Sequence, residues 1–117
     1  MWINLGIAYA KIKNNDKAHQ ALENAISLNP NSADAYYNLG IVYAELNEFE
    51  KTKENLKKVI ELDPNYTRAY YKLGMVHGAL GEKEEAVKNL TKAQELLKSS
   101  NDSSFSSQID EALKKLN

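Results

Sequence analysis

The strongest constraint on the fold of this chain is a repeat of 34 residues. Leu5-Gly6 recurs as Leu39-Gly40 and as Leu73-Gly74, always at this spacing. The same shift aligns further leucines and the two prolines: Leu22 with Leu56 and Leu90, Leu28 with Leu62 and Leu96, and Pro30 with Pro64. A repeat of this length is one supersecondary unit that cannot bury its apolar face alone, so stacked neighbours must complete the core. We therefore expect a stack of three units.

Within a unit, the spacing of the apolar residues indicates helices. Tyr36, Leu39, Gly40 and Tyr43 stand at i, i+3, i+4 and i+7, which places them on one helical face. A glycine inside a helix costs about 1 kcal/mol relative to alanine. Because a glycine recurs here in all three units, we expect a second helix to pack closely against it.

The residues expected on that second helix are small in two of the units. They are alanines in the first and third units: Ala18, Ala25, Ala86 and Ala93. The second unit has the larger, β-branched Thr52 and Val59, so we expect its helices to lie slightly further apart. Even there, Gly40→Leu should be severely destabilising, since overpacking a helix contact costs about 1–3 kcal/mol.

Prolines and a capping pattern set the expected helix boundaries. Pro30 and Pro64 cannot continue a helix, so each should follow the second helix of its unit. Asn47, followed three residues later by Glu50, is typical of a capping box and predicts the start of the fourth helix. Lys98 replaces the repeated proline, so the sixth helix should run longer. The helices are expected at about 1–13, 16–29, 33–46, 49–62, 67–80 and 83–98.

A seventh helix is expected at the C-terminus. Residues 99–104 are a polar break containing N-cap candidates. Beyond it an apolar stripe follows at helical spacing: Phe105, Ile109, Ala112, Leu113 and Leu116. We interpret this segment as a capping helix that covers the exposed apolar face of the last repeat. The alternative is a recognition helix for a partner.

The repeated residues resemble the tetratricopeptide repeat family over nearly the whole chain. The match comprises Trp2, Leu5, Gly6, Tyr9, Ala18, Leu22, Ala25 and Pro30, then Tyr36, Leu39, Gly40, Tyr43, Leu56 and Pro64, then Tyr70, Leu73, Gly74, Ala86, Leu90 and Ala93. The resemblance implies an all-α fold, a right-handed α-solenoid of three helix–turn–helix units plus a C-terminal capping helix. We expect one domain, 1–117, with repeats at about 1–32, 33–66 and 67–100 and the capping helix at about 103–117.

Composition excludes several classes of function. Fifteen Lys and Arg residues against sixteen Asp and Glu give a formal net charge of -1, without the basic excess of a nucleic-acid-binding protein. There is no cysteine, which excludes disulfides and thiol catalysis. No stretch approaches the ~20 apolar residues of a membrane span, so membrane insertion is not expected. No basic segment precedes the apolar N-terminus, so we expect no signal peptide and a cytoplasmic location.

The sequence contains no recognisable catalytic or metal-binding arrangement. His77 stands where the first two units have Tyr9 and Tyr43, so we expect it to be a structural replacement partly buried between helices. No Ser, Asp or Glu is paired with it in sequence for general-base catalysis. No glycine-rich phosphate loop is present. We therefore expect no enzymatic activity, no cofactor and no metal.

The expected function follows from the resemblance, which implies that the first helix of each unit lines a concave groove where peptides or proteins bind. The residues expected to contact a peptide are Asn4, Ile7, Tyr37, Asn38, Ile41, Arg68, Tyr71, Lys72 and Met75. Exposed apolar residues at this density favour a contact surface, with the aromatic ones as anchors. The alternative is that the isoleucines and tyrosines pack between adjacent first helices.

Two known subtypes of the family match only in part. The carboxylate clamp that holds the acidic C-termini of heat-shock chaperones is half present, with Asn38, Arg68 and Lys72 in place. Ile3 and Ile7 stand at its first-unit positions and cannot donate hydrogen bonds to a carboxylate. The asparagine ladder that grips a peptide backbone in the O-linked N-acetylglucosamine transferase is matched by Asn4 and Asn38, and Lys72 interrupts it.

Two other classes of function remain open. One is a self-assembling scaffold, a homo-oligomer joined through the first unit. That unit starts two residues short of a full repeat, so we expect its first helix to be uncapped. The other is the recruiting arm of an enzyme. The main hypothesis is a non-catalytic interaction module within a larger protein or assembly.

Overall fold

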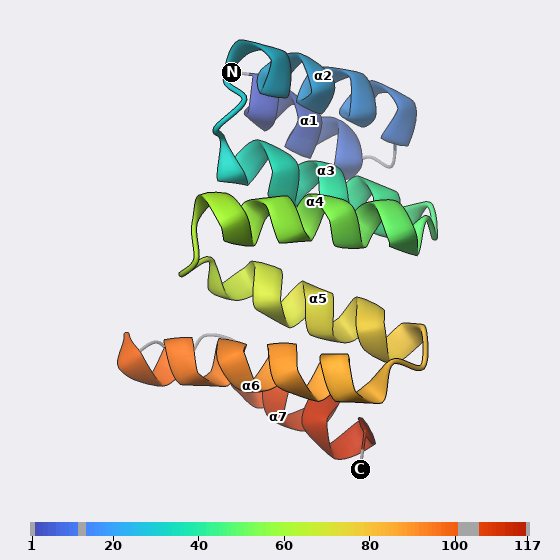
Figure 1. The fold of residues 1–117 in the computed structure, drawn as a ribbon. Coiled ribbons are helices and arrows are strands. Elements are labelled where there is room, and N and C mark those ends of the chain that lie inside the picture. Colours follow the sequence, from blue (N-terminus) through green and yellow to red (C-terminus); the bar gives the residue numbers. More distant parts are fainter. Residues whose placement is uncertain (1, 12–13, 101–105, 117) are drawn as a thin grey trace. The chain divides into compact units, whose positions relative to one another are not determined.

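The structure is a computed structural model that describes residues 2–11, 14–100 and 106–116 (Figure 1). These residues form seven helices and no strand. The helices are α1 (Trp2–Lys11), α2 (Asn15–Leu28), α3 (Ala33–Glu45), α4 (Phe49–Leu62), α5 (Thr67–Ala79), α6 (Lys83–Ser99) and α7 (Ser106–Leu116). The expected all-α fold and all seven expected helices are therefore confirmed.

The contacts divide the chain into two compact units, Met1–Pro64 and Asn65–Asn117. In the first unit α1 pairs with α2, α3 pairs with α4, and α2 also packs on α3. In the second unit α5 pairs with α6, and α7 contacts both. Each of the three pairs is an antiparallel hairpin (Figure 1). The three expected hairpins are present, and the single domain stays a prediction.

The repeated glycines lie where the two helices of a hairpin meet. A Cβ atom on Gly74 would lie 2.5 Å from Leu90 Cγ, and one on Gly6 would lie 2.6 Å from Leu22 Cγ. At Gly40 the nearest atoms, on Asn55 and Leu56, would be 3.5 Å away, which is ordinary contact. The contact is thus looser in the hairpin that carries Thr52 and Val59, as expected. The steric basis for a severe effect of Gly40→Leu is correspondingly weaker.

The turns after α3 and α5 share one backbone arrangement. Asn47 (φ 60°) and Gly81 (φ 77°) occupy equivalent places and have left-handed conformations. The N–H of Glu48 donates to the Tyr43 carbonyl at 2.9 Å, and that of Glu82 donates to the His77 carbonyl at 2.8 Å. Both are 6→1 bonds. In the same turns the N–H groups of Asn47 and Gly81 donate 5→2 bonds to the carbonyls of Ala44 and Gly78. The two kinds of bond together form the Schellman motif that ends a helix.

The expected capping box at Asn47 is therefore wrong. The N-cap of α4 is Glu48, whose side chain makes no capping hydrogen bond. Asn47 belongs to the end of α3, because asparagine tolerates the left-handed conformation that this motif requires.

The helices before the two prolines end as expected. The C-cap residues Asn29 and Asp63 each precede a proline, and their N–H groups donate to Ala25 and Val59 carbonyls at 2.9 and 2.8 Å. Without a proline at the matching place, α6 extends to Ser99 and has 17 residues, against 14 in α2 and in α4. The longer sixth helix is thus confirmed.

The core of the first unit includes a cluster shared by α2 and α3. Ala18, Leu22, Leu39 and Val42 are buried there, with Ile26 and Tyr43 packed beside them. Within the described residues, no helix is long and apolar enough to cross a membrane.

The core of the second unit depends on α7. Ile109 is fully buried among Leu90, Ala93 and Leu97 of α6. Ala112, Leu113 and Leu116 pack against the same cluster. The capping role of this helix is confirmed, while Phe105, the first residue of the expected stripe, lies outside the described residues.

Candidate functional site

The helix α5 carries four of the expected binding residues. It contains Arg68 and Lys72 and no acidic residue. Met75 is 44% exposed, although it is apolar. The ammonium group of Lys72 lies 5.6 Å from the centroid of the Tyr71 ring, within the range of a cation–π contact. One helix therefore combines apolar contact area with net positive charge.

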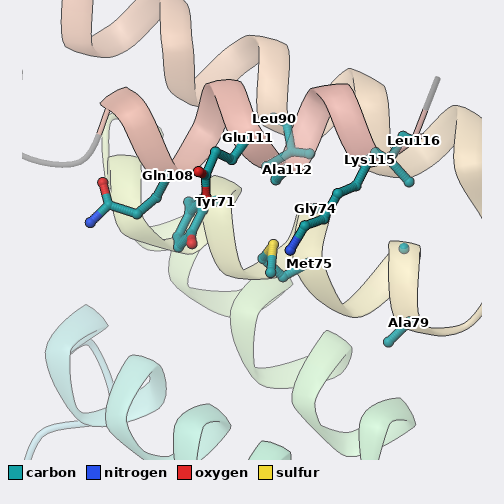
Figure 2. Close-up of a pocket in the computed structure, with 11 residues that line it drawn as sticks. Tyr71, Gly74, Met75, Ala79, Leu90, Gln108, Glu111, Ala112, Lys115 and Leu116 are labelled. Carbon is teal, nitrogen blue, oxygen red and sulfur yellow. The ribbon is translucent and has the colours of Figure 1, made fainter.

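A pocket of about 450 Å³ lies beside these residues, within the second unit (Figure 2). It is an open pocket lined by α5, α7 and Leu90 of α6, and its volume falls in the range typical of small-ligand sites. Most of its lining is apolar. The lining residues are Tyr71, Gly74, Met75, Gly78, Ala79, Leu90, Gln108, Glu111, Ala112, Lys115 and Leu116.

Two departures from the repeat help to open this pocket. Gly78 stands where the second repeat has Ala44, and Ala79 stands where it has Glu45. Both changes remove side-chain atoms from α5 at the pocket wall. A Cβ atom on Gly78 would lie 3.6 Å from Leu116 Cδ2, so the space in front of this residue faces α7.

The polar groups of the pocket come from α7. Figure 2 shows the Glu111 side chain directed toward Tyr71 and the Lys115 side chain extending toward Met75. Gln108 lines the same side. These residues occupy one face of α7, since they stand three to four positions apart. An apolar group entering the pocket would thus meet charges of both signs at its polar side.

The expected binding residues of the first unit are less accessible. Tyr37 is only 9% exposed, so little of its ring is accessible, and its role as an aromatic anchor stays a prediction. Asn38 is half-buried, and its amide donates to the Asp34 carbonyl one turn earlier at 2.8 Å. Ile7 and Ile41 are half-buried, and the side chain of Asn4 lies outside the described residues.

The buried histidine has a structural partner. His77 is 5% exposed, and its Nδ1 lies 2.7 Å from a carboxylate oxygen of Glu82 at the start of α6. This contact joins the end of α5 to the next helix, as expected for a structural replacement of tyrosine. Among the residues that the structure describes, no three His, Asp or Glu side chains are grouped so as to hold a metal ion.

Sequence reasoning missed the contribution of α7 to this site. We interpreted the helix as a cap, and that role accounts for Ile109 and its apolar neighbours. Gln108, Glu111 and Lys115 share a second face, a signal that was visible in the sequence. The small residues at 78 and 79 were a further signal, because they break the repeat where other units have larger side chains.

Three family models match the chain. They are described as Tetratricopeptide repeat at residues 33–66, TPR repeat at 6–47 and Tetratricopeptide repeat at 55–88. Together they span 6–88, well over half of the sequence. The chain belongs to the tetratricopeptide repeat family. No curated protein matches it in sequence.

Solved structures share the fold. The TPR2B domain of yeast Sti1, in its complex with pHsp70, has a TM-score of 0.92 at 28% identity, covering 97% of this chain and 92% of that one. The first TPR of Spaghetti (RPAP3), bound to an HSP90 peptide, gives 0.89 at 23%, covering 98% and 86%. The Yersinia enterocolitica translocator chaperone SycD gives 0.91 at 18%, covering 98% and 80%.

Proposed function

We propose that this chain is a non-catalytic interaction module that binds a partner peptide carrying an apolar anchor and an acidic group. The observation that carries the proposal is α5, where exposed Met75 and half-buried Tyr71 lie on a helix with two basic residues and no acidic one. The likeness to the Sti1 TPR2B domain, solved in its complex with pHsp70, supports it.

The second unit supplies the main contacts in this proposal. Tyr71 and Met75 contact the anchor, and Arg68 and Lys72 attract the acidic group. These two cations are four residues apart, so they project from one helical face. In the first unit, Asn4, Ile7, Asn38 and Ile41 are proposed as further peptide contacts, and the largely buried Tyr37 as a minor one.

The partner is proposed to differ from the chaperone tails held by a complete carboxylate clamp. Ile3 and Ile7 are both half-buried apolar residues at the two first-unit positions of that clamp. A terminal carboxylate would lose those two donors. An acidic side chain facing Arg68 and Lys72 requires no such clamp.

The test is a double charge reversal, Arg68→Glu with Lys72→Glu. Random dodecamer peptides displayed on phage are selected on the unmodified protein, and the best sequence is synthesised and titrated by calorimetry. We expect a Kd on the order of 1–100 μM. Reversal should weaken binding at least tenfold, or about 1.4 kcal/mol. Binding to the unmodified protein should also weaken as salt rises, because exposed charges are screened.

The matched control is Lys88→Glu with Lys92→Glu on α6. These lysines are exposed and also four residues apart, so the change in net charge is the same. Unchanged helicity of both variants is confirmed by circular dichroism. An equal loss of peptide affinity in both double variants would contradict the proposed role of Arg68 and Lys72. So would an unchanged affinity when these two residues are reversed.

One observation favours a second function, self-association through α1. Leu5 is 39% exposed, whereas the equivalent Leu39 and Leu73 are 4% and 2% exposed. A second copy packing on this side of α1 would bury Leu5 as its counterparts are buried. Sedimentation velocity from about 1 to 500 μM, a range set to detect the affinities of weak dimers, should then show a dimer. Leu5→Glu should abolish it, and Leu46→Glu, at a comparably exposed leucine, should not. A monomer at every concentration contradicts this function.

A further inference from the structure

We infer that the pocket lined by α5, α6 and α7 receives the apolar anchor of the bound peptide, a side chain of leucine or methionine size. In this inference α7 is a wall of the binding site in addition to a cap. The inference rests on the proposed function, which by itself places the anchor only on Tyr71 and Met75. The inference adds the pocket that receives the anchor and the residues that select the size of the anchor side chain.

The pocket offers accessible space of suitable chemistry. Its volume of about 450 Å³ lies within the range of ligand-binding pockets. One anchor side chain fills only part of this, so adjacent peptide backbone also fits. Gly74, Leu90, Ala112 and Leu116 present no charged group to an entering side chain. Burial of such a side chain favours binding because it removes apolar surface from water.

The third repeat departs locally from the repeat pattern at Gly78. Gly78 is the second-last residue of α5, and glycine favours a helix less than alanine does. The packing of α5 does not require this glycine, because a Cβ atom there would meet Leu116 and Ala86 at ordinary distances of 3.6 and 3.9 Å. The residue that does require glycine, Gly74, lies one turn earlier. Gly78 therefore leaves space that the fold alone does not need, and that space forms part of the pocket.

A positive charge lies close to the pocket along α5. Lys72 lies three residues before Met75, about 4.5 Å along the helix axis. An extended peptide advances about 3.3 Å per residue. An acidic residue one to three positions from the anchor would therefore reach Lys72 while the anchor occupies the pocket. The expected motif is a leucine or methionine with a nearby aspartate or glutamate.

The first experiment uses Met75 as a reporter in the unmodified protein. The chain has two methionines, Met1 and Met75, so ¹³C-methyl-methionine labelling gives two assignable signals. Titration with the selected dodecamer should shift the Met75 methyl signal strongly and the Met1 signal little. The same peptide with its anchor changed to alanine should bind at least tenfold more weakly. Tight binding that leaves the Met75 signal unchanged overturns the inference.

The second experiment is a double-mutant cycle between the anchor and Gly78. Gly78→Leu fills the pocket, whereas Gly78→Ala adds only the tolerated Cβ atom and serves as the folding control. Gly78→Leu should weaken binding of the original peptide at least tenfold and binding of the alanine peptide less than twofold. Groups in contact show such coupling, whereas distant ones act additively. Additive effects place the anchor elsewhere and overturn the inference.

The outcomes separate this inference from the proposed function. If the dodecamer binds and responds to charge reversal at Arg68 and Lys72 but not to Gly78→Leu, the function stands and the pocket assignment fails. If selection yields no peptide that binds in solution, both fail. If Gly78→Leu does not fold, Ala79→Leu, at an exposed residue of the same pocket wall, takes its place in the cycle and decides the question.

Discussion

At the scale of single residues, the structure distinguishes glycines that the sequence makes look equivalent. Gly40 and Gly74 occupy the same repeat position. A Cβ atom added at Gly40 would lie 3.5 Å from its nearest neighbour atom, whereas one at Gly74 would lie 2.5 Å away, a difference of about 1 Å. The sequence indicated the direction of this difference through Thr52 and Val59, because larger residues hold the helices of that hairpin apart.

This difference predicts opposite effects of alanine at the two glycines. Gly74→Ala places a Cβ atom against the buried Leu90 and 3.2 Å from the Ala86 carbonyl, so it should destabilise the fold by about 1–3 kcal/mol. Gly40→Ala makes only ordinary contacts and should be neutral or stabilising by up to about 1 kcal/mol, since alanine favours helix. Urea unfolding followed by circular dichroism measures both. Equal destabilisation at both sites would contradict this account.

At the scale of helices, the predicted elements agree closely with the structure because the apolar spacing is strong and recurs three times. The differences have local causes. The sequence around Asn47 fits two roles, the N-cap of α4 in a capping box and the left-handed residue that ends α3. The sequence pattern alone does not show which role Asn47 has. Tyr37 shows the helical spacing of an exposed anchor, but its burial depends on packing that a single-helix pattern does not contain.

The helix α7 provides the test at this scale. Ile109 is fully buried against α6, so Ile109→Ala should cost about 2–5 kcal/mol in the free energy of unfolding. Leu28→Ala removes a comparable side chain that is 74% exposed and should cost far less. Thermal and urea unfolding of both variants measure the difference. A loss at Ile109 no larger than at Leu28 would mean that α7 is not part of the folded core.

At the scale of the whole molecule, the family could be recognised from the sequence, whereas the pocket beside α7 could not. The Leu-Gly pairs, leucines, alanines and prolines that recur at one period were sufficient for the family because the repeat itself defines the fold. The pocket arises where the third repeat departs from that pattern, at Gly78 and Ala79, next to a helix outside the repeat. The sequence does not show that these two small residues help to form a pocket, because the pocket also depends on where α7 packs.

The most direct test of the central claim is a photo-crosslink from the peptide anchor. The selected dodecamer is made with photo-leucine, a diazirine analogue, at its anchor position, irradiated on the unmodified protein and mapped by mass spectrometry. The account predicts crosslinks to α5 and α7, at Met75 and in the 112–116 segment, and their loss in Gly78→Leu. Crosslinks concentrated on α2, α4 or the Lys88–Lys92 side of α6 would contradict it.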